Sequence, residues 1–495
     1  ENEALRCFEE ASKTEPRNIR AWEKRAALLD KIGRYREAEE CLTQVLVLDE
    51  RNAVALHERG RIRRKMGRFS LALEDFERAL SLNSRDPLAL NGAGVCLTNL
   101  RQFTKALSYL NKAIRIEPRL EVAWRNKIWN LIEQGKTRMA LNICNKALAL
   151  FPSNPDFIEQ KGILLRELGR TDEALRYFNS ALELGPKEPT FWLNKGCALA
   201  KSDRFQGALE CFNEATRLNP TLREAWLEKA RCLMSIKDYA AAAKALGQAT
   251  EFRPVDELGK AHKTGDPEHY LANLVRAAEV GDQLLAVAKN VPEVLFVYAK
   301  LRYSTGWNWE ASESCSRLLE QEPHKVEALL LKARALNSLG SLLSPESLVH
   351  KSELHSEALE CAELAHSLQP SRGEPLLQKA TALALLGRSQ EALEAFESAL
   401  ALPAPSAEDW TMVAYALGLV KANTQALRAS EEALHRSPHS LDAIRFKTLA
   451  LSLIGRDNDA MTTLDAGLAL DPENEILRKL KVDLLRVKGV ELMDS

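Results

Sequence analysis

An alanine returns every 34 residues through the first half of this 495-residue chain. The series is Ala4, Ala38, Ala72, Ala106, Ala140, Ala174, Ala208 and Ala242, and the same position returns at Ala311, Ala358, Ala392, Ala426 and Ala460. A proline stands twelve residues after several of these alanines, as at Pro186 and Pro220. A fixed period of roughly 20–50 residues marks a repeat architecture, in which each unit packs only on its neighbours. The period therefore predicts a solenoid instead of separate globular domains.

Residues 189–220 show what one repeat contains. Trp192 and Gly196 belong to one apolar stripe at helical spacing, and after a polar turn Ala208 belongs to a second. Gly196 and Ala208 are expected where the two helices cross, because only a minimal side chain lets the backbones approach closely. Pro220 ends the second helix, since proline supplies no backbone donor and moves the preceding residue out of the α region. Each repeat is therefore predicted to be a helical hairpin.

The hairpins resemble the tetratricopeptide repeat. The matching positions are Trp192, Gly196, Ala208, Phe212, Ala215 and Pro220 in one repeat, and Leu56, Gly60, Ala72, Phe76 and Ala79 in another. The resemblance covers nearly the whole chain. It implies an all-α, right-handed superhelical solenoid of about 12–13 helix–turn–helix repeats, whose first helices line a concave groove for a protein or peptide.

The period also divides the chain into segments. We expect the second helix of a truncated repeat at 1–18, seven regular repeats at 19–254, a degenerate repeat or joint at 255–291, five repeats at 292–474 with an insertion near 341–353, and a C-terminal capping helix at 475–495. The insertion falls in the turn of a hairpin, so we expect it to form a loop on one face of the solenoid.

Charge is distributed unevenly between the two halves. Residues 51–150 hold 19 Lys and Arg against 8 Asp and Glu; the counts are 43 against 34 for 1–254, and 25 against 35 for 255–495. The resemblance places His57, Arg61, Arg64 and Lys65 toward the groove. Two interpretations stay open: helix faces in solvent are charged in any case, or a basic groove steers an acidic segment of a partner.

Other predicted groove residues are polar or aromatic. In the following repeats they are Arg125, Asn126, Trp129, Gln160 and Asn194. A row of side-chain amides can pair with an extended peptide backbone, because each amide both donates and accepts hydrogen bonds. Ordinary exposed amides explain the same residues. Trp129 is either an anchor for a partner or a side chain packed between hairpins.

The second array of repeats has a more apolar predicted lining. Phe296, Tyr303 and Tyr415 are its aromatic members. Such a surface suits an amphipathic helix or a second copy of the chain. Tighter packing of the superhelix is the alternative.

No pattern of catalytic or metal-binding residues accompanies the repeats. The sequence has no phosphate-binding loop, no dinucleotide fingerprint, no HExxH and no GxSxG. His262, Asp266, Glu268 and His269 cluster in the degenerate segment, but a polar loop without supporting groups argues against a metal site. We therefore expect no enzyme activity, no cofactor and no metal.

Nine cysteines without a CxxC pair indicate small packing residues in a reducing cytoplasm. No apolar run is long enough to span a membrane. These features predict a non-catalytic protein-binding scaffold, complete in itself or the recognition arm of a larger signalling, transferase or sensor protein. The alternative is a nucleic-acid-binding solenoid that uses the basic groove. The lack of interleaved aromatics and a net charge of −1 argue against it.

Overall fold

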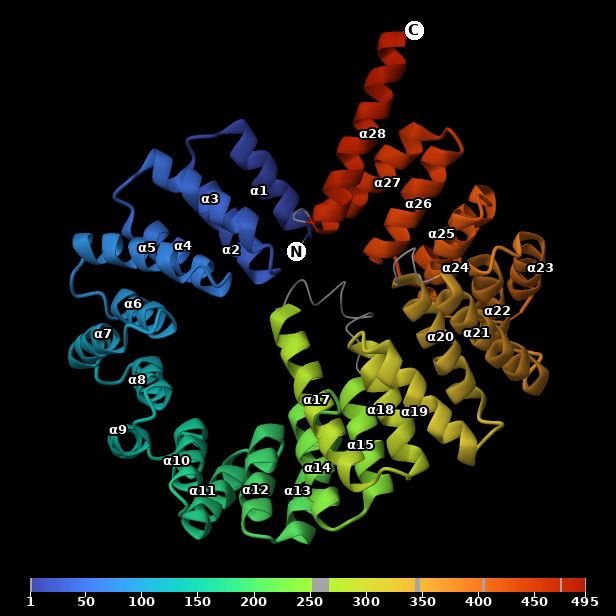
Figure 1. Cartoon of the computed structure of the whole chain (residues 1–495). Coiled ribbons are helices and arrows are strands. Elements are labelled where there is room, and N and C mark those ends of the chain that lie inside the picture. The colour runs from blue at the N-terminus through green and yellow to red at the C-terminus, as the bar shows by residue number, and fades with distance from the viewer. Residues whose placement is uncertain (1, 252–266, 343–347, 403–405, 472–473, 495) are drawn as a thin grey trace. The chain divides into compact units, whose positions relative to one another are not determined.

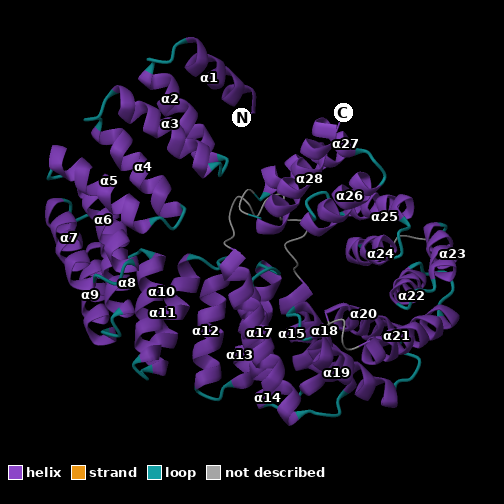
Figure 2. Cartoon of the chain, turned by 45° about the horizontal axis from the view of Figure 1, so that its top comes forward, coloured by secondary structure: helices purple, strands orange, loops and turns teal. Residues whose placement is uncertain are grey.

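Every regular element in the described part of the chain is a helix (Figures 1 and 2). The computed structural model describes residues 2–251, 267–342, 348–402, 406–471 and 474–494. The predicted all-α solenoid of helical hairpins is confirmed. Its helices are α1 (Asn2–Thr14), α2 (Ile19–Lys31), α3 (Tyr35–Leu48), α4 (Ala53–Lys65), α5 (Phe69–Leu82), α6 (Pro87–Asn99), α7 (Phe103–Ile116), α8 (Glu121–Glu133), α9 (Thr137–Leu150), α10 (Pro155–Glu167), α11 (Thr171–Leu184), α12 (Pro189–Lys201), α13 (Phe205–Leu218), α14 (Arg223–Ser235), α15 (Tyr239–Glu251), α17 (Pro267–Val287), α18 (Pro292–Ser304), α19 (Asn308–Gln321), α20 (Val326–Leu342), α21 (Leu348–Leu368), α22 (Glu374–Leu385), α23 (Ser389–Leu400), α24 (Ala407–Leu419), α25 (Asn423–Arg436), α26 (Leu441–Leu453), α27 (Asp457–Leu470) and α28 (Glu475–Asp494).

Short polar segments begin and end these helices. Asn52 precedes α4, and its side chain accepts a hydrogen bond from the backbone N–H of Ala55, which satisfies an amide that the helix itself leaves without a partner. Gly67 follows the same helix with a φ of 73°, a backbone conformation that glycine adopts without a steric penalty. Arg101 and Asp203 take this conformation in other hairpins. The turn geometry therefore repeats even where glycine is absent.

In several hairpins the two helices meet at a contact between glycine and phenylalanine. A Cβ atom added to Gly196 would lie 2.6 Å from Cε1 of Phe212, and one added to Gly162 would lie equally close to Phe178. Ala208, on the facing helix, is fully buried. Gly196 therefore lies at a close approach of the two helices, as predicted, and Ala208 is buried on the facing helix.

Tryptophans at the fourth position of several first helices form a recurrent hydrogen bond. The indole N–H of each donates to the carbonyl of the proline six residues earlier, at 2.8–2.9 Å; the pairs are Trp22–Pro16, Trp124–Pro118, Trp192–Pro186 and Trp226–Pro220. That proline follows the preceding helix. The bond therefore fixes each first helix to the end of the hairpin before it.

The chain divides into two compact units, and the boundary falls within α14. Unit 1 spans residues 2–232, and unit 2 comprises the described residues from Leu233 onward. The predicted joint at 255–291 begins with residues outside the described ranges. From Pro267 to Val287 it forms the single helix α17, which packs on α15 and α18. The predicted division into individual repeats stays a prediction.

The insertion near 341–353 differs from the expected loop. Residues 348–353 form the first part of α21, and α20 continues to Leu342, so the hairpin has two long helices of 17 and 21 residues. Residues 343–347 lie outside the described ranges. The helical part contains Leu, Lys and Glu, which favour helix. The two helices meet closely on either side of this part, because a Cβ atom at Gly340 would overlap the ring of His355.

All nine cysteines are free thiols, and seven of them are buried. Burial raises the pKa of Cys96 and Cys144 to about 12, so both stay protonated and act as small apolar side chains. Cys197 is half-buried. Cys7 is exposed, so the packing interpretation was wrong for that residue.

Candidate binding surfaces

The predicted basic strip on α4 is largely neutralised by carboxylates of the same chain. Nη2 of Arg61 lies 2.9 Å from Asp30 on α2 and 2.6 Å from Glu58, and Nζ of Lys65 lies 2.7 Å from the other oxygen of Asp30. Hydrogen bonds from His57 and Arg61 lower the pKa of Glu58 to about 2, which keeps this carboxylate ionised. Arg61 and Lys65 therefore join α4 to α2, and little of their charge is left for a partner.

The other two residues of the strip have different surroundings. His57 is half-buried and meets the ring of Phe76 edge-on, with 5.6 Å between the ring centres. Arg64 is half-buried and forms no ion pair with any residue in the described ranges. Arg64 is thus the member of the strip whose charge is available to a partner.

Two amides of the predicted row, Asn126 and Asn194, bond to a neighbouring first helix. Asn126 on α8 donates to Oδ1 of Asn91 on α6 at 2.8 Å. Asn194 on α12 donates to Glu159 on α10 at 2.8 Å and accepts from Arg166 at 3.2 Å. These amides hold one first helix against the next.

Gln160, Arg125 and Trp129 complete the predicted surface of unit 1. Gln160 is half-buried and has no hydrogen-bond partner among the described residues. Arg125 is exposed, 3.4 Å from Asp156. Trp129 is half-buried, and its indole N–H donates to Glu133 on its own helix at 3.2 Å, so it is not fully enclosed between hairpins.

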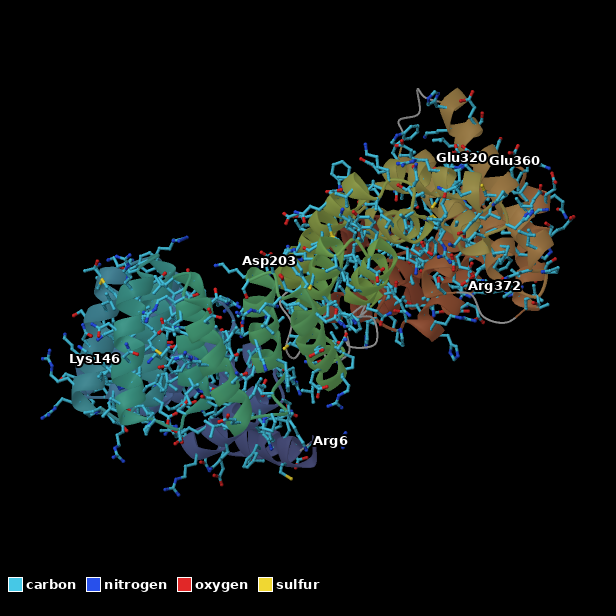
Figure 3. All side chains as sticks on the ribbon, turned by 90° about the horizontal axis from the view of Figure 1, so that it is seen from below. Arg6, Lys146, Asp203, Glu320, Glu360 and Arg372 are labelled. Atoms are coloured by element: carbon cyan, nitrogen blue, oxygen red, sulfur yellow. The ribbon has the colours of Figure 1, made fainter. Side chains whose placement is uncertain are left out.

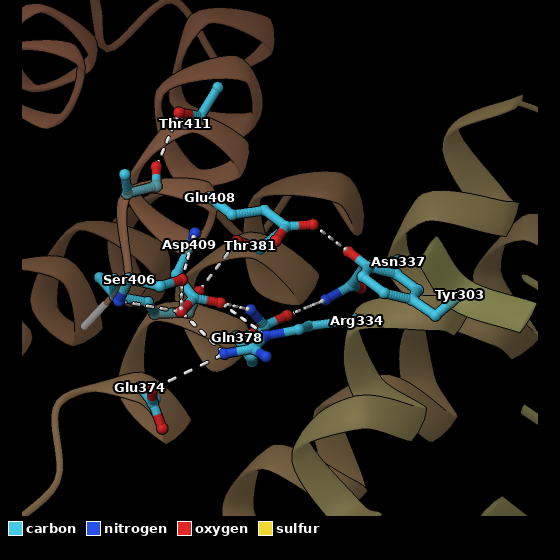
Figure 4. A network of polar contacts seen from close by, with 12 residues as sticks. Tyr303, Arg334, Asn337, Glu374, Gln378, Thr381, Ser406, Glu408, Asp409 and Thr411 are labelled. Atoms are coloured by element: carbon cyan, nitrogen blue, oxygen red, sulfur yellow. Dashed lines mark hydrogen bonds and ion pairs between the residues drawn. The ribbon is translucent and has the colours of Figure 1, made fainter. Parts of the chain in front are cut away.

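In unit 2 a buried polar network joins three first helices (Figure 4). The guanidinium of Arg334 on α20 makes two bonds, of 2.7 and 2.8 Å, to the carboxylate of Asp409 on α24. Gln378 on α22 donates to the same carboxylate at 2.8 Å, and Asn337 donates to Oε1 of Gln378 at 3.3 Å. Burial by itself would lower the pKa of Arg334, because it disfavours the charged guanidinium. The negative charge of Asp409 has the larger effect, so the pKa of Arg334 is raised.

Two further contacts complete this network. The hydroxyl of Tyr303 on α18 donates to Glu408 on α24 at 3.0 Å. The side chain of Ser406 accepts a hydrogen bond from the backbone N–H of Asp409, and the carboxylate of Asp409 accepts from the backbone N–H of Ser406, which forms a capping box at the start of α24. The first helices α18, α20, α22 and α24 are therefore linked across their facing sides.

Next to this network lies a pocket of about 350 Å³. Phe296, Tyr303 and Leu330 contribute apolar surface, and Lys300, Arg334 and Arg372 contribute cations. Of the predicted second-groove residues, the structure brings Phe296 and Tyr303 together here. Tyr415 lies elsewhere in unit 2, with its ring centre 5.6 Å from that of Phe446.

The cations of this pocket differ in how far they are already neutralised. Arg334 is bound to Asp409, and Arg372 forms ion pairs with Glu327 and Glu374. Nζ of Lys300 lies 4.9 Å from the ring centre of Phe296, and Lys300 forms no ion pair in the described part of the chain. Lys300 is therefore the cation of the pocket that is available to an anion.

Family models of the tetratricopeptide repeat match residues 19–52, 57–120, 131–195 and 193–257. This chain is a tetratricopeptide repeat protein. The helices from α2 to α15 form consecutive hairpins over the described part of these matched residues, which ends at residue 251. The resemblance noted in the sequence is thereby confirmed.

Solved structures of low identity share parts of this fold. A protein titled YrrB, a TPR protein with an unusual peptide-binding site, is 22% identical, with 38% of this chain and 96% of that chain covered, at a TM-score of 0.30. A tetratricopeptide repeat protein from Parabacteroides merdae is 17% identical, with 52% and 98% covered, at 0.43. A chain of the Naa15/Naa10 complex bound to HypK-THB is 14% identical, with 99% and 94% covered, at 0.32. No curated protein matches this sequence.

Among the residues that the structure describes, the tetratricopeptide repeat protein has no group of three or more His, Cys, Asp or Glu side chains that could hold a metal ion. Of the cluster noted in the sequence, His262 and Asp266 lie outside the described residues, as do the side chains of Glu268 and His269. In the described ranges, no helix is long and apolar enough to cross a membrane.

Sequence reasoning did not name Arg334, Asn337 and Gln378, although a signal for them was present. They occupy the ninth, twelfth and fifth positions of their first helices, which are groove positions in this family. A charged or amide side chain at such a position beside an apolar stripe indicates a polar partner on a neighbouring helix. Which helix supplies that partner depends on the curvature of the array.

Proposed function

We propose that this tetratricopeptide repeat protein is a non-catalytic scaffold that binds a partner peptide in the pocket of unit 2. The observation that carries the proposal is a pocket lined by the half-buried rings of Phe296 and Tyr303 next to Lys300, a cation without an ion pair among the described residues. A concave site with apolar walls and a few polar groups is the usual form of a ligand site. The chemistry fits an apolar side chain next to a carboxylate.

The buried network supports this choice of site. Because Arg334 and Arg372 are neutralised by acids of the chain, an anionic group of the partner is directed to Lys300. The network also holds the first helices that form the pocket walls in place before a partner arrives. A site that is already ordered binds with a smaller loss of conformational entropy.

The groove of unit 1 is a second proposed surface for the same function. Arg64 offers a cation, Gln160 an amide and Trp129 a half-buried ring. An extended acidic peptide matches these groups. His57, Arg61, Lys65, Arg125, Asn126 and Asn194 would then support this surface through the contacts described above. The free thiols favour a reducing compartment such as the cytoplasm.

The test uses a random peptide library displayed on phage and selected on the full-length chain. Selected peptides are synthesised with a fluorophore, and their affinities are measured by fluorescence polarisation. We expect peptides that combine an apolar residue with a nearby Asp or Glu. Lys300→Glu should lower the affinity of these peptides at least tenfold, because the peptide carboxylate then meets the like charge of the new glutamate.

Lys289→Glu is the matched control, since Lys289 is exposed on the same unit and lies outside the pocket lining. The Lys289→Glu variant should bind the selected peptides with an affinity within a factor of two of that of the parent chain. Peptides that bind equally well to the parent chain and to the Lys300→Glu and Phe296→Ala variants would refute the assignment of the pocket.

A further inference from the structure

The two second helices in the middle of unit 1 carry only basic charge. Helices α7 and α9 contain five Lys and Arg residues and no Asp or Glu: Lys105, Lys112, Arg115, Arg138 and Lys146. All five side chains are exposed. None forms an ion pair with a carboxylate in the ranges that the structure describes. We name these five residues the basic outer surface.

This surface faces away from the groove of unit 1. Leu107 and Ile114 of α7, and Ala140 and Cys144 of α9, belong to one hydrophobic cluster with α8, so the apolar sides of both helices point inward. Figure 1 shows α7 and α9 along the outer rim of unit 1, and their five basic side chains are exposed. Lys146 stands at the edge of this unit in Figure 3. Much of the basic surplus that the sequence assigned to the groove therefore lies on the outer side.

Three second helices of unit 2 carry the opposite charge. Helices α19, α21 and α23 together contain ten glutamates against two Lys and Arg. Glu313, Glu320, Glu360 and Glu394 are exposed and form no ion pair within the described residues. Glu320 and Glu360 lie on the rim of unit 2 in Figure 3. We name these four residues the acidic outer surface.

We propose that the basic outer surface of one copy of this chain binds the acidic outer surface of a second copy. The basic outer surface consists of five cations. The acidic outer surface consists of four carboxylates, with Arg317 between Glu313 and Glu320 on α19. The two surfaces differ in the sign of their net charge, so the contact joins two different surfaces. Such a heterologous contact leaves one surface free on each partner and can repeat from copy to copy. Opposite charges also accelerate the encounter and fix its orientation. This inference is independent of the peptide pocket.

A second copy fits these observations better than a nucleic acid does. The whole chain has a net charge of −1, whereas nucleic-acid binders are usually strongly basic. Both complementary surfaces are present on this one chain and need no further component.

The test is sedimentation velocity of the full-length chain over a range of concentrations, at low and at high salt. We expect the mass to rise above the 55.3 kDa of one chain with concentration at low salt. At high salt the monomer should return, because the Debye length falls to about 3 Å at 1 M. A chain that stays monomeric at every concentration in low salt would overturn the proposal.

Charge reversal on each surface separates this contact from non-specific attraction. The triple variant Lys105→Glu, Lys112→Glu and Lys146→Glu makes both surfaces acidic, and Glu313→Lys, Glu320→Lys and Glu360→Lys makes both basic. Each variant alone should associate at least tenfold more weakly than the parent chain. An equimolar mixture should associate again, because the reversed surfaces complement each other.

A matched control reverses three exposed bases of unit 1 outside the surface: Arg6→Glu, Lys13→Glu and Arg176→Glu. It changes the net charge equally and should associate like the parent chain. If this control weakens association as much as the first triple variant does, net charge is responsible and the proposed surfaces are not.

A mixture of the two reversed variants that stays monomeric contradicts the proposal as well. So does a single-stranded RNA oligonucleotide that binds the basic outer surface while the parent chain stays monomeric.

Discussion

At the scale of single residues, the glycines at the helix crossings make a sharp prediction. In Gly196→Ala the new Cβ atom would lie 2.6 Å from the buried ring of Phe212, so the helices must move apart. We expect a loss of about 1–3 kcal/mol in the free energy of unfolding, measured by urea denaturation.

Gly418→Ala is the control, because no heavy atom lies within 4 Å of the added Cβ atom in that helix. This change should stabilise the chain by roughly 0.5–1 kcal/mol through helix propensity. Equal effects at the two glycines would show that the crossing at Gly196 tolerates a methyl group.

The recurrent tryptophan bond gives a second prediction at this scale. Trp192→Phe keeps most of the apolar surface and removes the N–H that donates to the carbonyl of Pro186. The loss should be about 1 kcal/mol, read from the shift of the urea midpoint. Trp129→Phe is the comparison, because the indole of Trp129 bonds to Glu133 within its own helix and does not fix that helix to the hairpin before it, so its effect should be smaller. Equal shifts would contradict a stabilising role for the proline carbonyl.

Residue types alone predicted one of these two features. The glycine at the crossing follows from helical spacing, since the positions of Gly196 and Ala208 on their helices define the contact. The tryptophan bond does not follow in the same way. It depends on the turn after Pro186, which determines where that carbonyl points.

At the scale of helices, the Arg334–Asp409 pair predicts a large effect from a single change. Asp409→Ala leaves the guanidinium of Arg334 without its main partner and also removes the acceptor of Gln378. We expect a loss of about 3–5 kcal/mol in the free energy of unfolding, measured by urea denaturation. Glu397→Ala breaks the exposed pair with Arg428 and should cost less than about 1 kcal/mol. If Asp409→Ala lowers the free energy of unfolding as little as Glu397→Ala does, the buried network contributes little to stability.

The α20–α21 hairpin predicts a dependence of stability on pH. Burial lowers the pKa of His355 to about 4, and the charge of Lys351 adds to the effect, whereas the ordinary value is 6.5. The unfolded chain then binds more protons between these values, so stability is full above pH 6.5 and falls as the pH drops toward 4. The contribution is on the order of 3 kcal/mol.

This dependence is checked by urea unfolding of the parent chain and of His355→Phe at several pH values. The difference between the two should change between pH 6.5 and 4. His350→Gln, at an exposed histidine, should follow the parent chain. A parallel pH profile for His355→Phe would contradict a buried neutral histidine.

The helical hairpins could be predicted from the sequence, but contacts between distant repeats could not. The period and the apolar stripes define where hairpins begin and end, because both are local properties. The bond from Tyr303 to Glu408 spans 105 positions and joins α18 to α24. It depends on how tightly unit 2 curves, and small differences in packing at each hairpin add up to that curvature.

At the scale of the whole molecule, counts of charge did not tell which side of the solenoid carries it. The surplus of 19 Lys and Arg over 8 Asp and Glu in residues 51–150 led to the basic groove on α4. In the structure, Asp30 neutralises part of that groove, and α7 and α9 present unpaired cations on the outer side. A count over a sequence window combines both sides of every helix, so only the packing of the hairpins separates them.

Each hairpin packs on its neighbours, so the effects of a substitution should remain within its own compact unit. Gly196→Ala should raise amide hydrogen exchange in α11–α13 of unit 1 and leave α22–α26 of unit 2 unchanged. Asp409→Ala should raise amide hydrogen exchange in α22–α26 of unit 2 and leave α11–α13 of unit 1 unchanged. Each variant is therefore the control for the other. Hydrogen exchange followed by mass spectrometry of peptides from both units measures this. Exchange that rises equally in both units for either variant would show that the chain unfolds as a single cooperative body.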